Sequence, residues 1–152
     1  MGTVRKDQEG GQKLLILAII FSFTFFEICA TASPEMVKSY IDAGVALESR
    51  DEEGRTALMH AAQYNENPEV VKLLVREGAN IEARGRRGSY RGQTALMLAA
   101  AYNQNPDVTS ALLLSGAAIN ARDRDSFTAL LLAKLYNPNP EVAELLTRAG
   151  AE

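Results

Sequence analysis

The chain contains one cysteine, Cys29, and one histidine, His60, the residue types that most often supply a nucleophile and a general base. Such a pair needs hydrogen-bond contact and a third side chain that orients the histidine, and no third residue is evident. Two ligands also fall short of a zinc site, which takes four side chains or three and a water. We therefore expect no enzyme, no metal and no cofactor, with Cys29 in the core and His60 on a helix surface.

Arginines form a second group of chemically capable side chains. Residues 84–92 hold four arginines and no acid, whereas residues 48–55 hold four acids and two arginines. The glycines of residues 88–94 superficially resemble a phosphate-binding loop, but Arg87 and Gln93 stand where that motif needs glycine and lysine, and no strand precedes them. The net charge is -3 and no second basic stripe or aromatic platform is present. We therefore expect no nucleic-acid binding.

These side chains lie within a repeated sequence. Residues 54–70 recur at 92–108 and, in altered form, at 126–142. One set of prolines and one set of glycines recur with the same steps of 34, 38 and 34 residues. The prolines are Pro34, Pro68, Pro106 and Pro140, and the glycines are Gly44, Gly78, Gly116 and Gly150. A fixed period of this size predicts stacked units rather than one globular core. The longer middle step places a four-residue insertion in residues 84–92.

Each unit encodes two short helices. A threonine precedes a short apolar run, where its hydroxyl can accept a hydrogen bond from free backbone N–H groups; the three are Thr56, Thr94 and Thr128. An Asn-Pro-Glu, Asn-Pro-Asp or Ser-Pro-Glu sequence then opens the second helix, since proline is tolerated at the first helical position. Apolar residues follow at helical spacing, and a glycine ends the unit.

The pattern Gly54-x-Thr56-Ala57-Leu58-x-x-Ala61-Ala62, followed by Pro68-Glu69-Val70-Val71-x-Leu73-Leu74-x-x-Gly78-Ala79-Asn80-Ile81, resembles the ankyrin repeat. His60 stands one position beyond the histidine of that family, so the usual hydrogen-bonding role of that histidine is not carried over. The Tyr-Asn-x-Asn-Pro-Glu joint resembles a variant associated with bacterial ankyrin proteins. The resemblance implies an all-α repeat solenoid over residues 25–152, in about four units at 25–48, 49–86, 87–120 and 121–152.

The N-terminal segment, residues 1–24, has two interpretations. An uncharged apolar run from Leu14 to Phe26 follows basic residues and precedes Ala30-Thr31-Ala32, which together describe a secretory signal peptide. Cleavage after Ala32 would remove the first helix of unit one, however, and a hydrophobic capping helix packed on that unit is the alternative. Export or membrane anchoring is the favoured interpretation.

The resemblance also implies a function, because ankyrin arrays bind partner proteins on a concave face of inner helices and projecting loops. We expect a monomeric, non-catalytic scaffold of this kind. The alternatives are an exported or membrane-tethered protein that protects or inhibits an envelope enzyme, and a fragment of a longer protein. The residue-by-residue candidates for partner contact are Glu52, Glu53, Arg55, Gln63, Tyr64, Arg86, Arg87, Tyr90, Arg91, Gln93, Ala101, Tyr102, Arg124, Asp125, Phe127, Leu135 and Tyr136.

Two features of this surface have open interpretations. The basic loop from Arg84 to Arg91 either contacts an acidic partner, with Tyr90 supplying apolar area, or is a solvated, flexible insertion, since loops tolerate added residues. Tyr64, Tyr102 and Tyr136, which recur at one phase, either line the groove or pack against each other and the helix joints. The asparagines that follow these tyrosines are expected to satisfy backbone groups.

Overall fold

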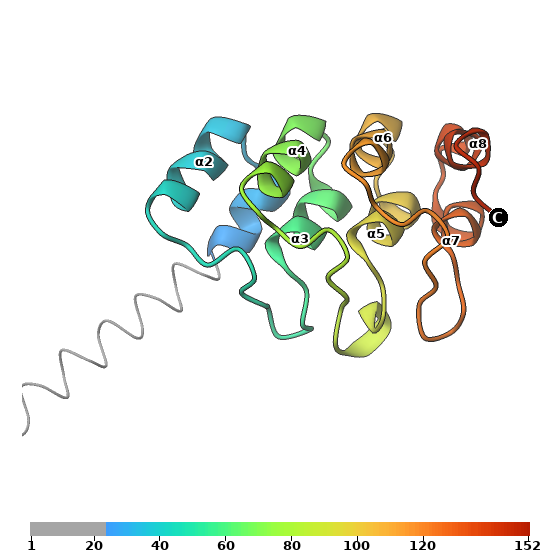
Figure 1. The fold of residues 1–152 in the computed structure, drawn as a ribbon, viewed down its shortest axis with the longest axis horizontal. Coiled ribbons are helices and arrows are strands. Elements are labelled where there is room, and N and C mark those ends of the chain that lie inside the picture. Colours follow the sequence, from blue (N-terminus) through green and yellow to red (C-terminus); the bar gives the residue numbers. More distant parts are fainter. Residues whose placement is uncertain (1–23) are drawn as a thin grey trace, which may run out of the picture.

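The structure is a computed structural model in which residues 24–152 are described. Their helices stack side by side in pairs, each pair joined to the next by a long loop that projects from one side of the stack (Figure 1). The inner helices are residues 24–31, α3 (Ala57–Tyr64), α5 (Ala95–Tyr102) and α7 (Ala129–Tyr136). The outer helices are α2 (Pro34–Asp42), α4 (Pro68–Arg76), α6 (Pro106–Leu114) and α8 (Pro140–Arg148). The predicted all-α repeat solenoid is confirmed.

Local sequence explains where the outer helices begin and end. The side-chain oxygen of Asn67 accepts a hydrogen bond of 3.0 Å from the backbone N–H of Glu69, and proline follows it at the first helical position. Two residues after α4, Gly78 takes a left-handed conformation with φ +102°, which ends the helix without the strain a side chain would add. The same cap and glycine recur in the units that follow.

Helices α3, α5 and α7 begin after threonine, as predicted, but their caps differ. Thr94 and Thr128 accept hydrogen bonds from the backbone N–H groups of Met97 and Leu131, at 3.4 and 3.3 Å. The hydroxyl of Thr56 has no hydrogen-bond partner within the described residues. Two of the three predicted caps therefore form.

The core is continuous along the stack because small residues let the inner helices approach. Every residue of α5 from Ala95 to Ala101 is buried between its neighbours α3 and α7. On the outer helices Val70, Val108 and Val142 occupy one repeat position and are fully buried. Each such side chain contributes roughly 1.5–3 kcal/mol to stability, so the units stabilise one another.

Asparagine side chains join each unit to the one before it. The amide of Asn103 donates to the carbonyl oxygens of Ala62 and Asn65, at 3.0 and 2.9 Å. Asn65 and Asn137 make the equivalent pairs of bonds to the units that precede them. The expected role of these asparagines is confirmed, and the backbone groups they satisfy belong to the neighbouring unit.

The first described helix packs as part of unit one. Phe25, Phe26 and Cys29 are buried, and the Phe26 ring stacks on the imidazole of His60 with 5.1 Å between centroids. Most of the apolar run that begins at Leu14 lies outside the described residues, so the choice between signal peptide, anchor and capping helix stays a prediction. Among residues 24–152, no helix has the length and apolar character needed to cross a bilayer.

Candidate protein-binding surface

Three tyrosines at the ends of α3, α5 and α7 form an exposed aromatic row. About half of each residue is exposed, from 43% at Tyr102 to 54% at Tyr136. The rings of Tyr102 and Tyr136 stack with 6.4 Å between centroids, while Tyr64 lies against His60 at 6.2 Å. The tyrosines therefore contact their neighbours and also present surface to a partner.

The loops that precede the inner helices project beside this row, and we call them finger two (residues 48–55), finger three (82–93) and finger four (120–127). Finger three contains the predicted insertion, which forms the short 3-10 turn η1 (Gly88–Tyr90) closed by a bridge between Gly85 and Arg91. It also pairs with finger two, since the backbone N–H of Arg87 donates to the carbonyl of Glu53 at 3.0 Å. Fingers two and three are thus joined into one surface.

Glycine permits the close approach of fingers two and three. Gly54 has φ +77°, and a Cβ placed on it would lie 2.5 Å from the Cβ of Arg86. No side chain fits there without moving one finger. The glycine therefore fixes the distance between the acidic finger and the basic one.

Arg55 is the centre of a polar network at the base of finger two. Its guanidinium pairs with Asp51 at 2.9 Å and Glu53 at 3.0 Å, and it donates to Gln63 at 3.1 Å. The same group lies 4.5 Å from the centre of the Tyr90 ring, a cation–π contact with the insertion. Arg55 is thus mostly engaged within the protein, and it holds the candidate residues of two fingers together.

The sequence analysis expected His60 on the helix surface, and this expectation is wrong. Finger two folds over the side chain. Its side chain is only 12% exposed, and its Nε2 lies 2.8 Å from Oδ2 of Asp51. Since a carboxylate only accepts, Nε2 donates the hydrogen bond. Burial lowers the pKa of His60 below its usual value and outweighs the attraction of Asp51. Burial raises the pKa of Asp51, but hydrogen bonds from Arg55 and His60 bring it below its usual value.

Three residues expected at the surface are buried. Gln63 is 6% exposed because Arg55 and Tyr90 cover it, and its amide lies 3.5 Å from the Tyr90 hydroxyl. Gln93 is 7% exposed because its backbone, bonded to Gly85 and Tyr90, forms the base of finger three. Ala101 faces the neighbouring helices rather than the groove. These three are withdrawn as direct contacts.

The other candidates remain accessible to different degrees. Tyr90 and Phe127 are half-buried, and the side chain of Arg55 is only 11% exposed. The exposed ones are Glu52, Glu53, Tyr64, Arg86, Arg87, Arg91, Tyr102, Arg124, Asp125, Leu135 and Tyr136. The structure thus places most predicted contacts on the fingers and the tyrosine row.

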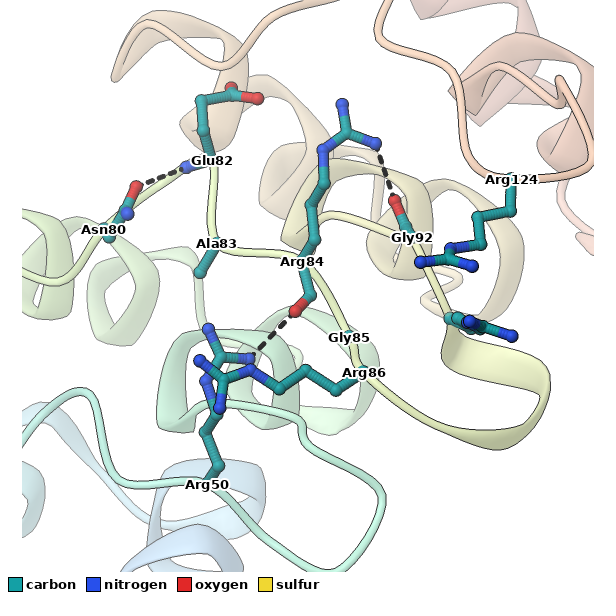
Figure 2. Close-up of a pocket in the computed structure, with 10 residues that line it drawn as sticks. Arg50, Asn80, Glu82, Ala83, Arg84, Gly85, Arg86, Gly92 and Arg124 are labelled. Atoms are coloured by element: carbon teal, nitrogen blue, oxygen red, sulfur yellow. Dashed lines mark hydrogen bonds between the residues drawn. The ribbon is translucent and has the colours of Figure 1, made fainter.

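An arginine ladder along the fingers was missed by the residue-by-residue reasoning. The guanidinium of Arg50 donates to the carbonyl of Arg84 at 2.9 Å, and that of Arg84 donates to the carbonyl of Gly92 at 2.8 Å (Figure 2). Arg50 also donates to the carbonyl of Gly54 at 2.6 Å, and Arg84 to that of Arg122 at 2.7 Å. Arg122 closes its own finger through Ser126 at 3.1 Å. The signal was in the sequence, because the three arginines recur with the same steps as the prolines.

Cys29 is fully buried, and burial raises the pKa of its thiol to about 12, so the reactive thiolate is suppressed at neutral pH. In the described part of the chain, no three His, Cys, Asp or Glu side chains are placed together to hold a metal. The side chains of the surface therefore provide hydrogen bonds, charge and aromatic area.

Comparison with known proteins agrees with this architecture. A family model described as ankyrin repeats, in three copies, matches the chain at residues 5–85, 25–123 and 65–152. A search of curated proteins found no match.

Proposed function

Because this chain belongs to the ankyrin repeat family, whose members are generally protein–protein interaction modules, we propose that it is a non-catalytic, monomeric scaffold that binds another protein. The partner contacts the inner-helix face and the fingers. The observation that carries the proposal is the exposed row of Tyr64, Tyr102 and Tyr136 beside the connected fingers. Tyrosine is enriched where interfaces concentrate their binding energy, because its ring buries a large area and its hydroxyl keeps a hydrogen bond.

Rigidity supports this proposal. The asparagine bonds between units and the arginine ladder between fingers fix the surface before any partner arrives. Binding to a preformed surface loses less conformational entropy than binding to a mobile one. The hydrogen-bonded stack therefore favours tight association over a modest area.

The charge of finger three indicates the chemistry of the partner. Arg86, Arg87 and Arg91 are exposed, and none of them has a carboxylate within 4.0 Å among the described residues. Such groups attract an acidic surface and accelerate its association. We propose that the partner places an acidic patch against the loop from Arg84 to Arg91.

Affinity capture with surface variants tests the function. Immobilised wild-type chain is compared with a Tyr102→Ala/Tyr136→Ala variant and with Leu114→Ala, whose side chain is 83% exposed on outer helix α6. The proposal expects one set of partner proteins to be retained by wild type and Leu114→Ala and lost from the tyrosine variant. Circular dichroism confirms that all three are folded. Equal retention by the folded tyrosine variant would contradict a role for the inner-helix face.

A further inference from the structure

Finger three lines most of an open hollow of about 490 Å³, to which fingers two and four each contribute one arginine (Figure 2). Five arginines line it, namely Arg50, Arg84, Arg86, Arg91 and Arg124. Glu82 is the one acid among the lining residues, and no aromatic side chain is among them. The hollow thus gathers positive charge from three different units of a chain whose net charge is -3.

The positive charge of this hollow is not neutralised within the described residues. None of its five arginines lies within 4.0 Å of a carboxylate. The carboxylate of Glu82 accepts instead from the backbone N–H of Ala118 at 2.8 Å, in the next unit. Arg55 makes the contrast clear, because it is paired with both Asp51 and Glu53. Like charges held together repel one another, so an anion that enters the hollow relieves that repulsion.

The five arginines divide into two groups. Arg50 and Arg84 each donate two hydrogen bonds to finger carbonyls, which holds their guanidinium groups in place. Arg86, Arg91 and Arg124 make no side-chain hydrogen bond or ion pair in the described part of the chain, and all three are exposed. Two fixed and three available guanidinium groups around one hollow are suited to carboxylates, which accept two parallel hydrogen bonds from one arginine.

We propose that this hollow binds an extended acidic segment of the partner protein, with several carboxylates spread over fingers two to four. This inference rests on the proposed function and specifies the part of the partner that is recognised. An extended segment fits because the arginines come from three fingers, with Arg50 and Arg124 on opposite sides of finger three in Figure 2. A nucleic-acid strand fits less well, since the hollow has no aromatic ring on which a base stacks.

The test uses fluorescein-labelled octaglutamate as the probe and fluorescence anisotropy as the readout, at low salt where exposed charges are least screened. The test variant replaces the three available arginines, Arg86→Ala, Arg91→Ala and Arg124→Ala. A matched control removes the same charge outside the hollow, with Arg76→Ala, Lys134→Ala and Arg148→Ala. We expect the test variant to lose at least about tenfold in affinity and the control to change by less than about twofold.

A measurement on the wild-type chain covers the case in which the test variant does not fold. The side-chain Nε–H resonances of Arg86, Arg91 and Arg124 are followed by NMR during titration with octaglutamate. We expect these three to shift together and to saturate at the dissociation constant from anisotropy. Shifts confined to other arginines, or no binding at all, would overturn the proposal.

Competitors distinguish the acidic segment from other anions. Inorganic phosphate that displaces octaglutamate at equal concentration would indicate a compact-anion site, and oligothymidylate that binds as tightly as octaglutamate would indicate a nucleic-acid site. Either result overturns the proposal, as does an equal loss of affinity in the test and control variants. Absence of octaglutamate binding with tyrosine-dependent capture intact refutes this inference and the acidic patch proposed for the partner, and it leaves the scaffold function in place. Octaglutamate binding without tyrosine-dependent capture contradicts instead the proposed role of the inner-helix face.

Discussion

The guanidinium of Arg55 lies 4.5 Å from the centre of the Tyr90 ring, and this contact joins the acidic finger two to the inserted residues of finger three. Tyr90 comes from the four-residue insertion, whereas Arg55 occupies a regular repeat position. The insertion is therefore integrated into the array at the point where Gln63 is covered.

This contact predicts different effects for two changes at one position. Tyr90→Phe keeps the aromatic face and loses a long hydrogen bond to Gln63, so its free energy of unfolding should stay near that of wild type. Tyr90→Leu removes the cation–π attraction, and we expect a loss of about 0.5–1 kcal/mol. Urea unfolding of both variants measures this difference. Indistinguishable midpoints would mean that Arg55 draws no stability from the ring.

The asparagine bonds between units predict a large effect from a small truncation. Asn103→Ala leaves the buried carbonyls of Ala62 and Asn65 without their donors. We expect the free energy of unfolding to fall by about 2 kcal/mol or more, because unsatisfied buried groups are costly. Gln104→Ala, at the exposed neighbouring position, should change it by less than about 0.5 kcal/mol. Similar losses in the two variants would argue against the bridging role of Asn103.

Burial of His60 predicts a loss of stability in mild acid. The pKa of His60 in the folded chain is below its usual 6.5, so as pH falls through 6.5 the unfolded chain binds a proton that the folded chain does not. Stability therefore decreases from about pH 7 to about pH 5. Asp51 adds no change in this window, because its folded pKa lies below the usual 3.8 and its contribution is lost only at lower pH.

A variant that does not titrate checks this assignment. His60→Gln retains an N–H group for Asp51, so we expect its unfolding midpoint in urea to depend less on pH than that of wild type between these two values. The charged groups that act on His60 are Asp51, Arg55 and Glu53. An unchanged pH dependence in His60→Gln would assign the effect to another group.

Burial of Cys29 predicts that its thiol reacts much more slowly with a disulfide reagent in the folded chain than in the unfolded chain. Burial raises the pKa of its thiol to about 12, so the thiolate that attacks a disulfide reagent is almost absent at neutral pH. We expect no reaction of the native chain with Ellman's reagent on a timescale of minutes, and complete reaction in denaturant. Rapid reaction under native conditions would show that the helix carrying Cys29 does not stay packed on unit two.

Much of the fold could be predicted because its determinants are local. Asn67 and Pro68 specify the start of a helix through groups within three residues of them, and Gly78 specifies its end. The period then follows from counting. The proline and glycine markers also located the insertion, because it lengthens one step and leaves the others unchanged.

The surface was harder to predict because burial there depends on contacts between units. Gln63 was expected at the surface, but Arg55 from its own finger and Tyr90 from the next finger cover it. His60 was placed on the surface since nothing in its own helix shows that Asp51 folds back onto it. Arg84 looked like one of four equivalent arginines, yet its partners are carbonyls of its own finger and the next.

The central claim is that the inner-helix face, and not the outer helices, meets the partner. A photo-crosslinking amino acid placed at Tyr102 on α5, or at Leu114 on α6, tests it directly in the full chain within extracts of its source. We predict that position 102 forms a discrete covalent adduct, that excess unlabelled wild-type chain prevents its formation, and that position 114 forms none. The claim would be contradicted if such an adduct formed from position 114 alone, or if neither position formed one.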